Sequence, residues 1–249
     1  LTDREVYGRM SAALNATGRP ITFSLCQWGE HDVESWGADV AQMYRIQMDH
    51  LPLWHGPTSA AGAGFGQGTL EIIEFMASLR PSRYTKRFGW LDPDFLMTLY
   101  PLTMDFTSSR TEFSFWSFWS SPLLVATDVR RMSRRMSEIL LNEEAIAINQ
   151  DASATSGERL RNETSGAQVW ARALANGDKA VLLFNAQKHA IGVPTLDIAC
   201  SWEELGWPSD AAVKVRDVWA KQDLGVHRGN VTQRGIKPKD VRFLRLSRV

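Results

Sequence analysis

The spacing of apolar residues changes once along the chain, near residues 152–157, and this change limits the folds that the sequence can adopt. Up to about residue 151, short apolar runs alternate with stretches of helical spacing, a pattern typical of parallel βα units. Beyond the small, polar segment 152–157, short apolar runs are separated by turn signals such as Asn176-Gly177, a pattern typical of an antiparallel sandwich. The sequence therefore predicts an α/β domain over residues 1–152 and an all-β domain over residues 157–249.

The periodicity also predicts individual elements. In the first domain we expect helices at 6–14, 36–43, 69–79, 111–119 and 133–141, and strands at 21–25, 123–126 and 145–148. In the second domain we expect strands that include 169–171, 180–185, 213–218 and 241–246. The aromatic stripe within 111–119 is expected to be a buried helix rather than a cofactor site.

The composition argues against several classes of protein. The 249 residues include 28 Lys and Arg and 28 Asp and Glu, so the basic excess typical of nucleic-acid binders is missing. No apolar run approaches the roughly 18 residues that span a bilayer. The two cysteines lack zinc-site spacing and the five histidines form no pair with metal-ligand spacing, so we expect neither a metal nor a cofactor.

The beginning of the chain and its sequons bear on location. The sequence opens on Leu1 rather than Met, and it contains three Asn-x-Ser/Thr sequons, at Asn15, Asn162 and Asn230. We therefore expect a processed, secreted protein.

Polar residues follow the first expected strand. Cys26, Gln27 and Trp28 come directly after the apolar run 21–25. The carboxyl ends of parallel strands carry the active sites of barrel enzymes, so these residues are site candidates. The alternative is that Trp28 simply packs beneath a loop.

A second cluster occupies residues 45–50. If this segment is a strand, Arg45, Gln47 and Asp49 point to one face. An arginine and an aspartate on one face near a strand end can hold a sugar and supply a proton. They can equally form a structural ion pair.

A third cluster is Asp92-Pro93-Asp94, in which two carboxylates flank a proline that fixes the local geometry. Asp92 can cap the turn and Asp94 can face a ligand, but spacing does not separate these roles.

Two other motifs are rejected. The Gly-rich run 62–68 lacks the Gly-Lys-Ser/Thr of a phosphate-binding loop and is expected to be a flexible loop leading into a helix. No Gly-x-Ser-x-Gly elbow provides a serine nucleophile.

Taken in order, these clusters resemble the α-galactosidases (melibiases) of glycoside hydrolase family 27. The resemblance extends over nearly the whole chain, and its matching stretches are Leu14 to Pro20 with Ser24 to Gly29, Trp36-Gly37, the Arg-x-x-x-Asp of Arg45 and Asp49, Trp90 to Asp94, Pro122 to Arg130, Ala147 to Asp151, and Val215 to Trp219 with Asp223 to Gly225.

The resemblance implies a fold and an activity. Residues 1–152 are expected to form about the second half of a (β/α)8 barrel, and residues 157–249 an antiparallel β-sandwich. The implied reaction is retaining hydrolysis of terminal α-D-galactosyl residues from an oligosaccharide or polysaccharide. In that reaction one carboxylate attacks the anomeric carbon and a second protonates the leaving oxygen.

The resemblance also implies roles for individual residues. Asp49 stands at the position of the general acid/base, Arg45 at that of a sugar-binding arginine, and Asp94 at that of a residue lining the sugar pocket. The loop that contacts the substituent on the second carbon of the sugar corresponds to Cys26, Gln27 and Trp28.

Three departures from the family pattern stand out. Gln27 replaces a frequent Glu, and Leu91 replaces an Asn. The family's nucleophile lies in a Lys-x-Asp-x-Cys-like motif shortly upstream of Thr-Gly-Arg-Pro, and no such motif precedes Thr17 here. We therefore expect a fragment that is inactive alone, with the nucleophile, the first four βα units and the disulfide partner of Cys26 in a missing N-terminal half. The alternatives are an α-N-acetylgalactosaminidase, which needs room at the second carbon, and a non-catalytic galactose-binding paralogue.

Overall fold

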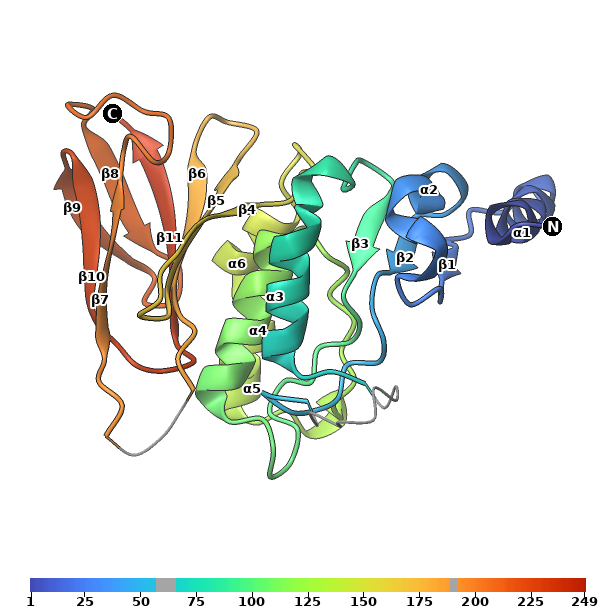
Figure 1. Ribbon diagram of the computed structural model, residues 1–249, viewed down its shortest axis with the longest axis horizontal. Helices are drawn as coiled ribbons and strands as arrows, with labels where there is room; N and C mark the ends of the chain where they lie inside the picture. Colours follow the sequence, from blue (N-terminus) through green and yellow to red (C-terminus); the bar gives the residue numbers. More distant parts are fainter. Residues whose placement is uncertain (57–65, 189–191) are drawn as a thin grey trace.

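The computed structural model describes residues 1–56, 66–188 and 192–249 (Figure 1). Residues 62–65 of the Gly-rich run lie outside these ranges, so the loop expected there is untested. The fold is a partial α/β barrel region followed by an antiparallel β-sandwich, as the sequence predicts.

Three short parallel strands form the sheet of the first domain. They are β1 (Ser24–Leu25), β2 (Met43–Arg45) and β3 (Trp90–Asp92), in that order. Val125 continues the parallel arrangement through an isolated bridge to Leu96. Because all four segments run in one direction, the residues that follow them gather at one edge of the sheet.

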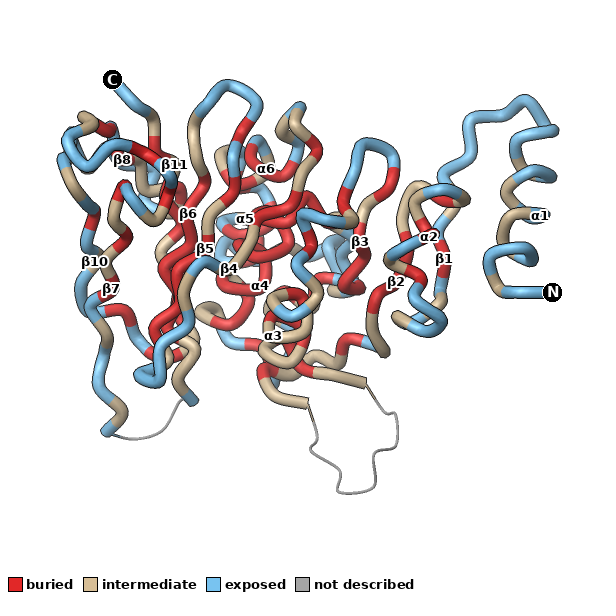
Figure 2. Tube along the Cα trace, turned by 45° about the horizontal axis from the view of Figure 1, so that its top comes forward, coloured by how far each residue is buried: buried red, intermediate tan, exposed pale blue. Residues whose placement is uncertain are grey.

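Helices alternate with these strands along the chain. They are α1 (Asp3–Ala16), α2 (Val33–Val40), α3 (Thr69–Leu79), α4 (Phe106–Phe118), α5 (Arg134–Leu140) and α6 (Glu143–Asn149), with short 3-10 turns at Glu30–Asp32, Pro81–Arg83 and Val129–Arg131. The helix α1 has no buried residue, and exposed and half-buried positions alternate along it (Figure 2). In contrast, α4 is buried along most of its length, which confirms the expectation for its aromatic stripe.

The second domain is a sandwich of two antiparallel sheets. The larger has the order β4-β5-β6-β11-β8-β9 and the smaller pairs β10 with β7. Their bounds are β4 (Glu158–Asn162), β5 (Ala167–Ala173), β6 (Lys179–Asn185), β7 (Leu196–Ser201), β8 (Val213–Asp217), β9 (Gln222–His227), β10 (Asn230–Ile236) and β11 (Val241–Arg248). Apolar side chains such as Val181, Val231 and Leu244 fill the space between the sheets.

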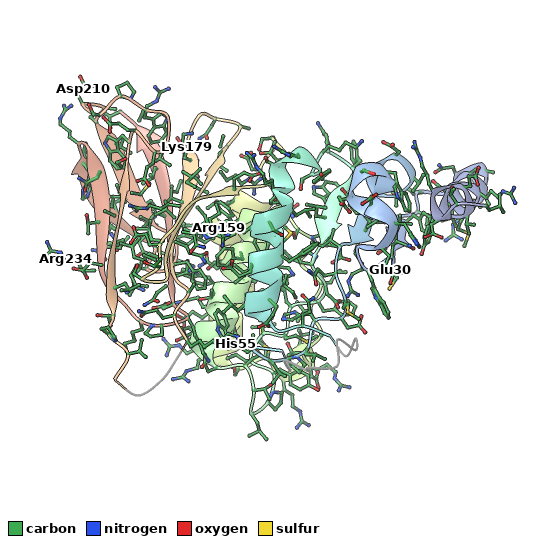
Figure 3. The ribbon with its side chains drawn as sticks, viewed as in Figure 1. Glu30, His55, Arg159, Lys179, Asp210 and Arg234 are labelled. Carbon is green, nitrogen blue, oxygen red and sulfur yellow. The ribbon has the colours of Figure 1, made fainter. Side chains whose placement is uncertain are left out.

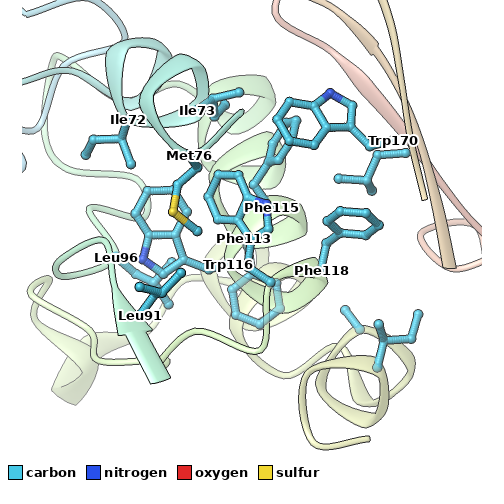
Figure 4. Packing of buried hydrophobic residues seen from close by; sticks show 14 of the residues in the cluster. Ile72, Ile73, Met76, Leu91, Leu96, Phe113, Phe115, Trp116, Phe118 and Trp170 are labelled. Atoms are coloured by element: carbon cyan, nitrogen blue, oxygen red, sulfur yellow. The ribbon is translucent and has the colours of Figure 1, made fainter. Parts of the chain in front are cut away.

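One continuous hydrophobic core joins the two domains (Figure 4). Phe115 of α4 contacts Trp170 and Phe184 of the sandwich edge to face, at centroid distances of 5.0 and 5.2 Å. Polar contacts reinforce the junction: Arg159 of β4 reaches toward α3 (Figure 3) and forms a 2.6 Å ion pair with Glu74. These buried aromatic contacts hold α4 against the sandwich. The other side of α4 packs behind the carboxyl edge of the parallel sheet, where Trp116 donates to the carbonyl of Asp94.

Three sequence-based assignments need correction. The strand expected at 145–148 is wrong, because these residues lie in α6. The Asn142 side chain caps that helix by accepting the N–H groups of Glu144 and Ala145, and its buried residues follow helical spacing. Residues 123–126 form only the bridge at Val125, and the strand expected at 21–25 is shortened to β1.

Among the described residues, none of the helices combines the length and the apolar character needed to cross a bilayer. Cys26 is exposed, Cys200 is buried, and both are free thiols.

Candidate active site

Three side chains from two adjacent strand ends meet at the carboxyl edge of the sheet. Nη2 of Arg45, the last residue of β2, lies 2.7 Å from Oδ2 of Asp94 and 3.2 Å from Oδ1 of Asp49. The side chains of Arg45 and Asp94 are only 10% and 8% exposed, whereas that of Asp49 is 60% exposed. One buried guanidinium therefore bridges a buried carboxylate and a carboxylate open to solvent.

The meeting of Arg45 and Asp49 does not arise as the sequence suggested. Because β2 ends at Arg45, residues 46–49 do not alternate as a strand. The chain turns instead, and Nη2 of Arg45 also donates to the carbonyl oxygen of Gln47 at 3.1 Å. The structure thus shows the ion pair that the sequence offered as one of two alternatives, and places it directly after the end of β2.

The turn after β3 is built around the two carboxylates. Oδ1 of Asp92 accepts the N–H of Asp94 at 2.9 Å, so Asp92 caps the turn. Asp94 adopts the left-handed region at φ +82°, which an aspartate tolerates better than most residues. Burial raises the pKa of Asp92 to about 6, against the lowering effects of that hydrogen bond and of Arg45.

The carboxylate of Asp94 is fully engaged. Its Oδ2 accepts the N–H of His50 at 2.9 Å as well as Arg45, and its Oδ1 accepts the N–H of Phe95 at 2.7 Å. These donors tie the loop after β2 to the loop after β3.

The loop after β1 lies near this cluster through its backbone. The N–H of Gly29 donates to the carbonyl of Arg45 at 3.2 Å, and a Cβ on Gly29 would lie 2.2 Å from the oxygen of Ile46. The side chain of Gln27, however, donates to Asp3 of α1 at 2.7 Å rather than to the Arg45 cluster. Trp28 is 42% exposed and Cys26 is exposed, so both are open to solvent beside that loop.

The sequence reading missed two buried ionisable residues behind the cluster. His50 follows Asp49 directly, and burial lowers its pKa to about 4. Glu112 lies inside α4 without exposure, and burial raises its pKa to about 8. The available signal for His50 was its place beside Asp49 at the end of the polar cluster 45–50, whereas no local pattern marks Glu112 within an aromatic helix.

No group of three or more His, Cys, Asp or Glu side chains within residues 1–56, 66–188 and 192–249 is arranged to hold a metal ion. The chemistry available at this edge is that of a carboxyl group, a guanidinium and the polar loop after β1. An exposed carboxyl held beside a fixed positive charge can exchange protons with a bound molecule.

A parallel sheet with acidic residues at its carboxyl edge, followed by a sandwich, is the architecture of a barrel-type glycoside hydrolase. The family model described as "Alpha galactosidase A" matches residues 2–151, and that described as "Alpha galactosidase C-terminal beta sandwich domain" matches residues 164–246. The chain belongs to the α-galactosidase (melibiase) family, glycoside hydrolase family 27.

Individual relatives agree with this assignment. The α-galactosidase of Oryza sativa subsp. japonica is 34% identical over 216 residues, which cover 87% of this chain and 47% of that protein. The α-galactosidase of Cyamopsis tetragonoloba is 31% identical over 229 residues, which cover 92% of this chain and 51% of that protein. The chain thus spans about half the length of these curated relatives.

Solved structures show the same fold. The crystal structure of α-galactosidase I from Mortierella vinacea matches with a TM-score of 0.89 and 28% identity, covering 98% of this chain and 62% of that one. The α-galactosidase of Saccharomyces cerevisiae, solved with raffinose, matches with a TM-score of 0.85 and 21% identity, covering 99% of this chain and 68% of that one.

Proposed function

We propose that this chain carries the galactose-binding and proton-donating part of a retaining α-galactosidase site, with an α-galactoside oligosaccharide or polysaccharide as its partner. The observation that carries the proposal is the contact of one buried guanidinium, that of Arg45, with both Asp49 and Asp94 at the carboxyl edge of the parallel sheet. Membership of the α-galactosidase family supports the choice of sugar.

Asp49 is the proposed general acid/base. Its carboxyl group is the exposed member of the cluster and therefore the one able to reach a departing glycosidic oxygen. In the first step it gives a proton to that oxygen, and in the second it takes one from water. Arg45 sets the position of this carboxyl group and offers its remaining N–H groups to sugar hydroxyls.

The other predicted site residues are proposed to shape the sugar pocket. Asp94 lines the pocket wall and, because its oxygens are occupied by protein donors, acts mainly by fixing Arg45. Cys26, Gln27 and Trp28 are proposed to face the second carbon of the sugar, with the exposed Trp28 ring available for stacking. For this contact Gln27 has to exchange its hydrogen bond with Asp3 for one with the ligand.

The retaining mechanism needs a second carboxylate as nucleophile. No Lys-x-Asp motif stands ahead of Thr17 in residues 1–249, so the family pattern assigns the nucleophile to none of them. We therefore propose that these 249 residues bind galactose but release no product by themselves.

Titration calorimetry with galactose, together with release of nitrophenol from nitrophenyl α-galactoside, tests both parts. Arg45→Met is expected to weaken galactose binding at least tenfold, while Arg131→Gln, a change at an exposed arginine, serves as the matched control. Absence of galactose binding by the folded wild-type chain contradicts the proposed function. Nitrophenol release that Asp49→Asn abolishes contradicts only the proposed lack of turnover.

N-acetylgalactosamine, titrated by the same calorimetry, provides the comparison for substrate class. We expect galactose to bind at least tenfold more tightly than N-acetylgalactosamine, because the Gln27 loop does not obviously leave room for an acetamido group. The reverse order favours the N-acetylgalactosaminidase alternative.

We also propose that the protein is secreted. The asparagines of all three sequons, Asn15, Asn162 and Asn230, are exposed, as glycan attachment requires. Expression through a secretory pathway, followed by an endoglycosidase, should give a mobility shift, and each Asn→Gln variant should remove part of it. Secreted protein without a shift contradicts glycosylation, and retention inside the cell contradicts secretion.

A further inference from the structure

His50 occupies a buried position where three elements meet. Its ring nitrogen Nδ1 lies 2.8 Å from the carbonyl oxygen of Phe95, and Nε2 lies 3.0 Å from Oγ1 of Thr69, the first residue of α3. The ring also stacks on Trp116 of α4, with centroids 5.4 Å apart and planes inclined by 27°. One side chain thus contacts the loop after β3, the start of α3 and the last turn of α4.

These partners assign the state of the ring. A carbonyl oxygen only accepts, so Nδ1 must carry the proton and donate it to Phe95. Nε2 is then free to accept the hydroxyl proton of Thr69. Burial lowers the pKa of His50, in keeping with a neutral ring. Glu112 of α4 stands behind the ring, with its Oε1 3.7 Å from Nδ1.

The same residue is joined to the proposed active site through its backbone. His50 directly follows Asp49, and its N–H donates to Asp94, which in turn binds Arg45. On the other side of the ring, Nε1 of Trp116 donates to the carbonyl of Asp94 at 2.8 Å. Contacts therefore connect α4, through the His50 ring, to the two loops that carry Asp49 and Asp94.

Asp49 itself has little anchorage. Its side chain is mostly exposed and has Arg45 as its hydrogen-bonding partner, and its carbonyl accepts the N–H of Gln67 at 2.7 Å. Arg45 therefore holds the carboxyl group of Asp49, whereas the backbone that carries it is fixed by Gln67 and by the hydrogen bond from the N–H of the next residue, His50, to Asp94.

We propose that His50 is a positioning residue: its ring, bonded to Phe95 and Thr69 and stacked on Trp116, holds the Asp49 and Asp94 loops at the separation that galactoside recognition requires. This inference rests on the proposed function and extends it, because it assigns the geometry of the site to a buried residue that does not touch the sugar.

The test uses the full 249-residue chain and four variants. His50→Phe keeps a ring to stack on Trp116 but removes both ring hydrogen bonds. Thr69→Val removes the donor to Nε2, and Thr69→Ser restores it. Val231→Ala, in the sandwich core, is the control for a general loss of stability, since Val231 is buried far from the sheet edge. The readouts are the Kd for galactose, thermal unfolding, and the ¹⁵N shifts of the His50 ring.

We expect galactose to bind about tenfold more weakly to His50→Phe and to Thr69→Val, and within twofold of wild type to Thr69→Ser and Val231→Ala. The ¹⁵N shifts should report an Nδ1–H ring in wild type and Thr69→Ser. If His50→Phe does not fold, the Thr69 pair decides the question by itself. Wild-type affinity in Thr69→Val or in folded His50→Phe overturns the positioning role alone, whereas a wild-type chain that does not bind galactose overturns the proposed function and this inference with it.

Discussion

Replacing Asp94 by asparagine isolates the charge on which the Arg45 cluster depends. In the structure the carboxylate accepts Nη2 of Arg45 at 2.7 Å and the backbone N–H groups of His50 and Phe95 at 2.9 and 2.7 Å. An asparagine oxygen can keep the hydrogen bond from Phe95, but its NH₂ group then faces two donors. The substitution leaves the backbone unstrained, because asparagine also tolerates the left-handed φ of +82°.

The size of the expected loss of stability follows from the burial of the Arg45–Asp94 ion pair. Removing one partner of a buried ion pair typically costs about 3–5 kcal/mol, because the remaining charge is left without compensation. Arg45 keeps a contact to Asp49, whose exposed side chain is screened by water, so we expect the lower end of that range, about 3 kcal/mol. For a chain of this length each kcal/mol lowers Tm by roughly 2–4 °C, which gives a fall of about 6–12 °C.

Urea unfolding followed by tryptophan fluorescence measures this loss, provided that the m-value stays unchanged. Asp128→Asn is the matched control, because Asp128 also pairs with an arginine, Arg130, but both side chains are more than half exposed. That variant should unfold as wild type does. A loss of stability in Asp94→Asn no larger than in Asp128→Asn would refute the argument that Arg45 depends on a buried counter-charge.

Further predictions concern a buried acid, a glycine and the domain junction. Burial raises the pKa of Glu112 from 4.5 to about 8, so between these values the folded chain keeps a proton that the unfolded chain has lost, and the contribution of this residue to stability falls as pH rises from about 4.5 to about 8. Glu112→Gln should flatten this decline in urea unfolding, and an unchanged slope contradicts the assignment. Gly29→Ala should lower both stability and galactose affinity by more than Gly177→Ala. Both glycines have a positive φ, but only at Gly29 would the added Cβ lie 2.2 Å from a backbone oxygen, that of Ile46. Equal effects of the two substitutions, measured by denaturation and calorimetry, contradict the close approach. Phe115→Ala should lower the free energy of unfolding by about 3–5 kcal/mol, because that ring joins the cores of both domains. The variant should still unfold in a single calorimetric transition. Two separate transitions in the wild type contradict the shared core.

Local sequence features predicted much of this fold because they act over a few residues. The helix 69–79 coincides with α3, since its apolar residues recur at helical spacing and face the core. Residues 180–185 fall within β6 because a continuous apolar run bounded by turns suits a strand buried on both faces. The error at 145–148 has the opposite cause: a four-residue apolar run fits either structure, and the Asn142 cap together with burial against α4 decided for helix.

For the site, the sequence supplied candidate residues and left their roles open. Arg45, Asp49 and Asp94 stood in polar clusters that spacing alone explained equally well by an ion pair or a turn cap, and their expected roles came from the resemblance to the α-galactosidases. Three features became visible only in the folded chain: Arg45 reaches both carboxylates, Gln27 bonds to Asp3, and His50 and Glu112 lie behind the Arg45 cluster. Apolar periodicity predicts which face of a helix or strand is buried, because it depends on residues only a few positions apart. Contacts between residues far apart in the chain depend instead on how the parallel strands pair and on which helix packs behind their ends.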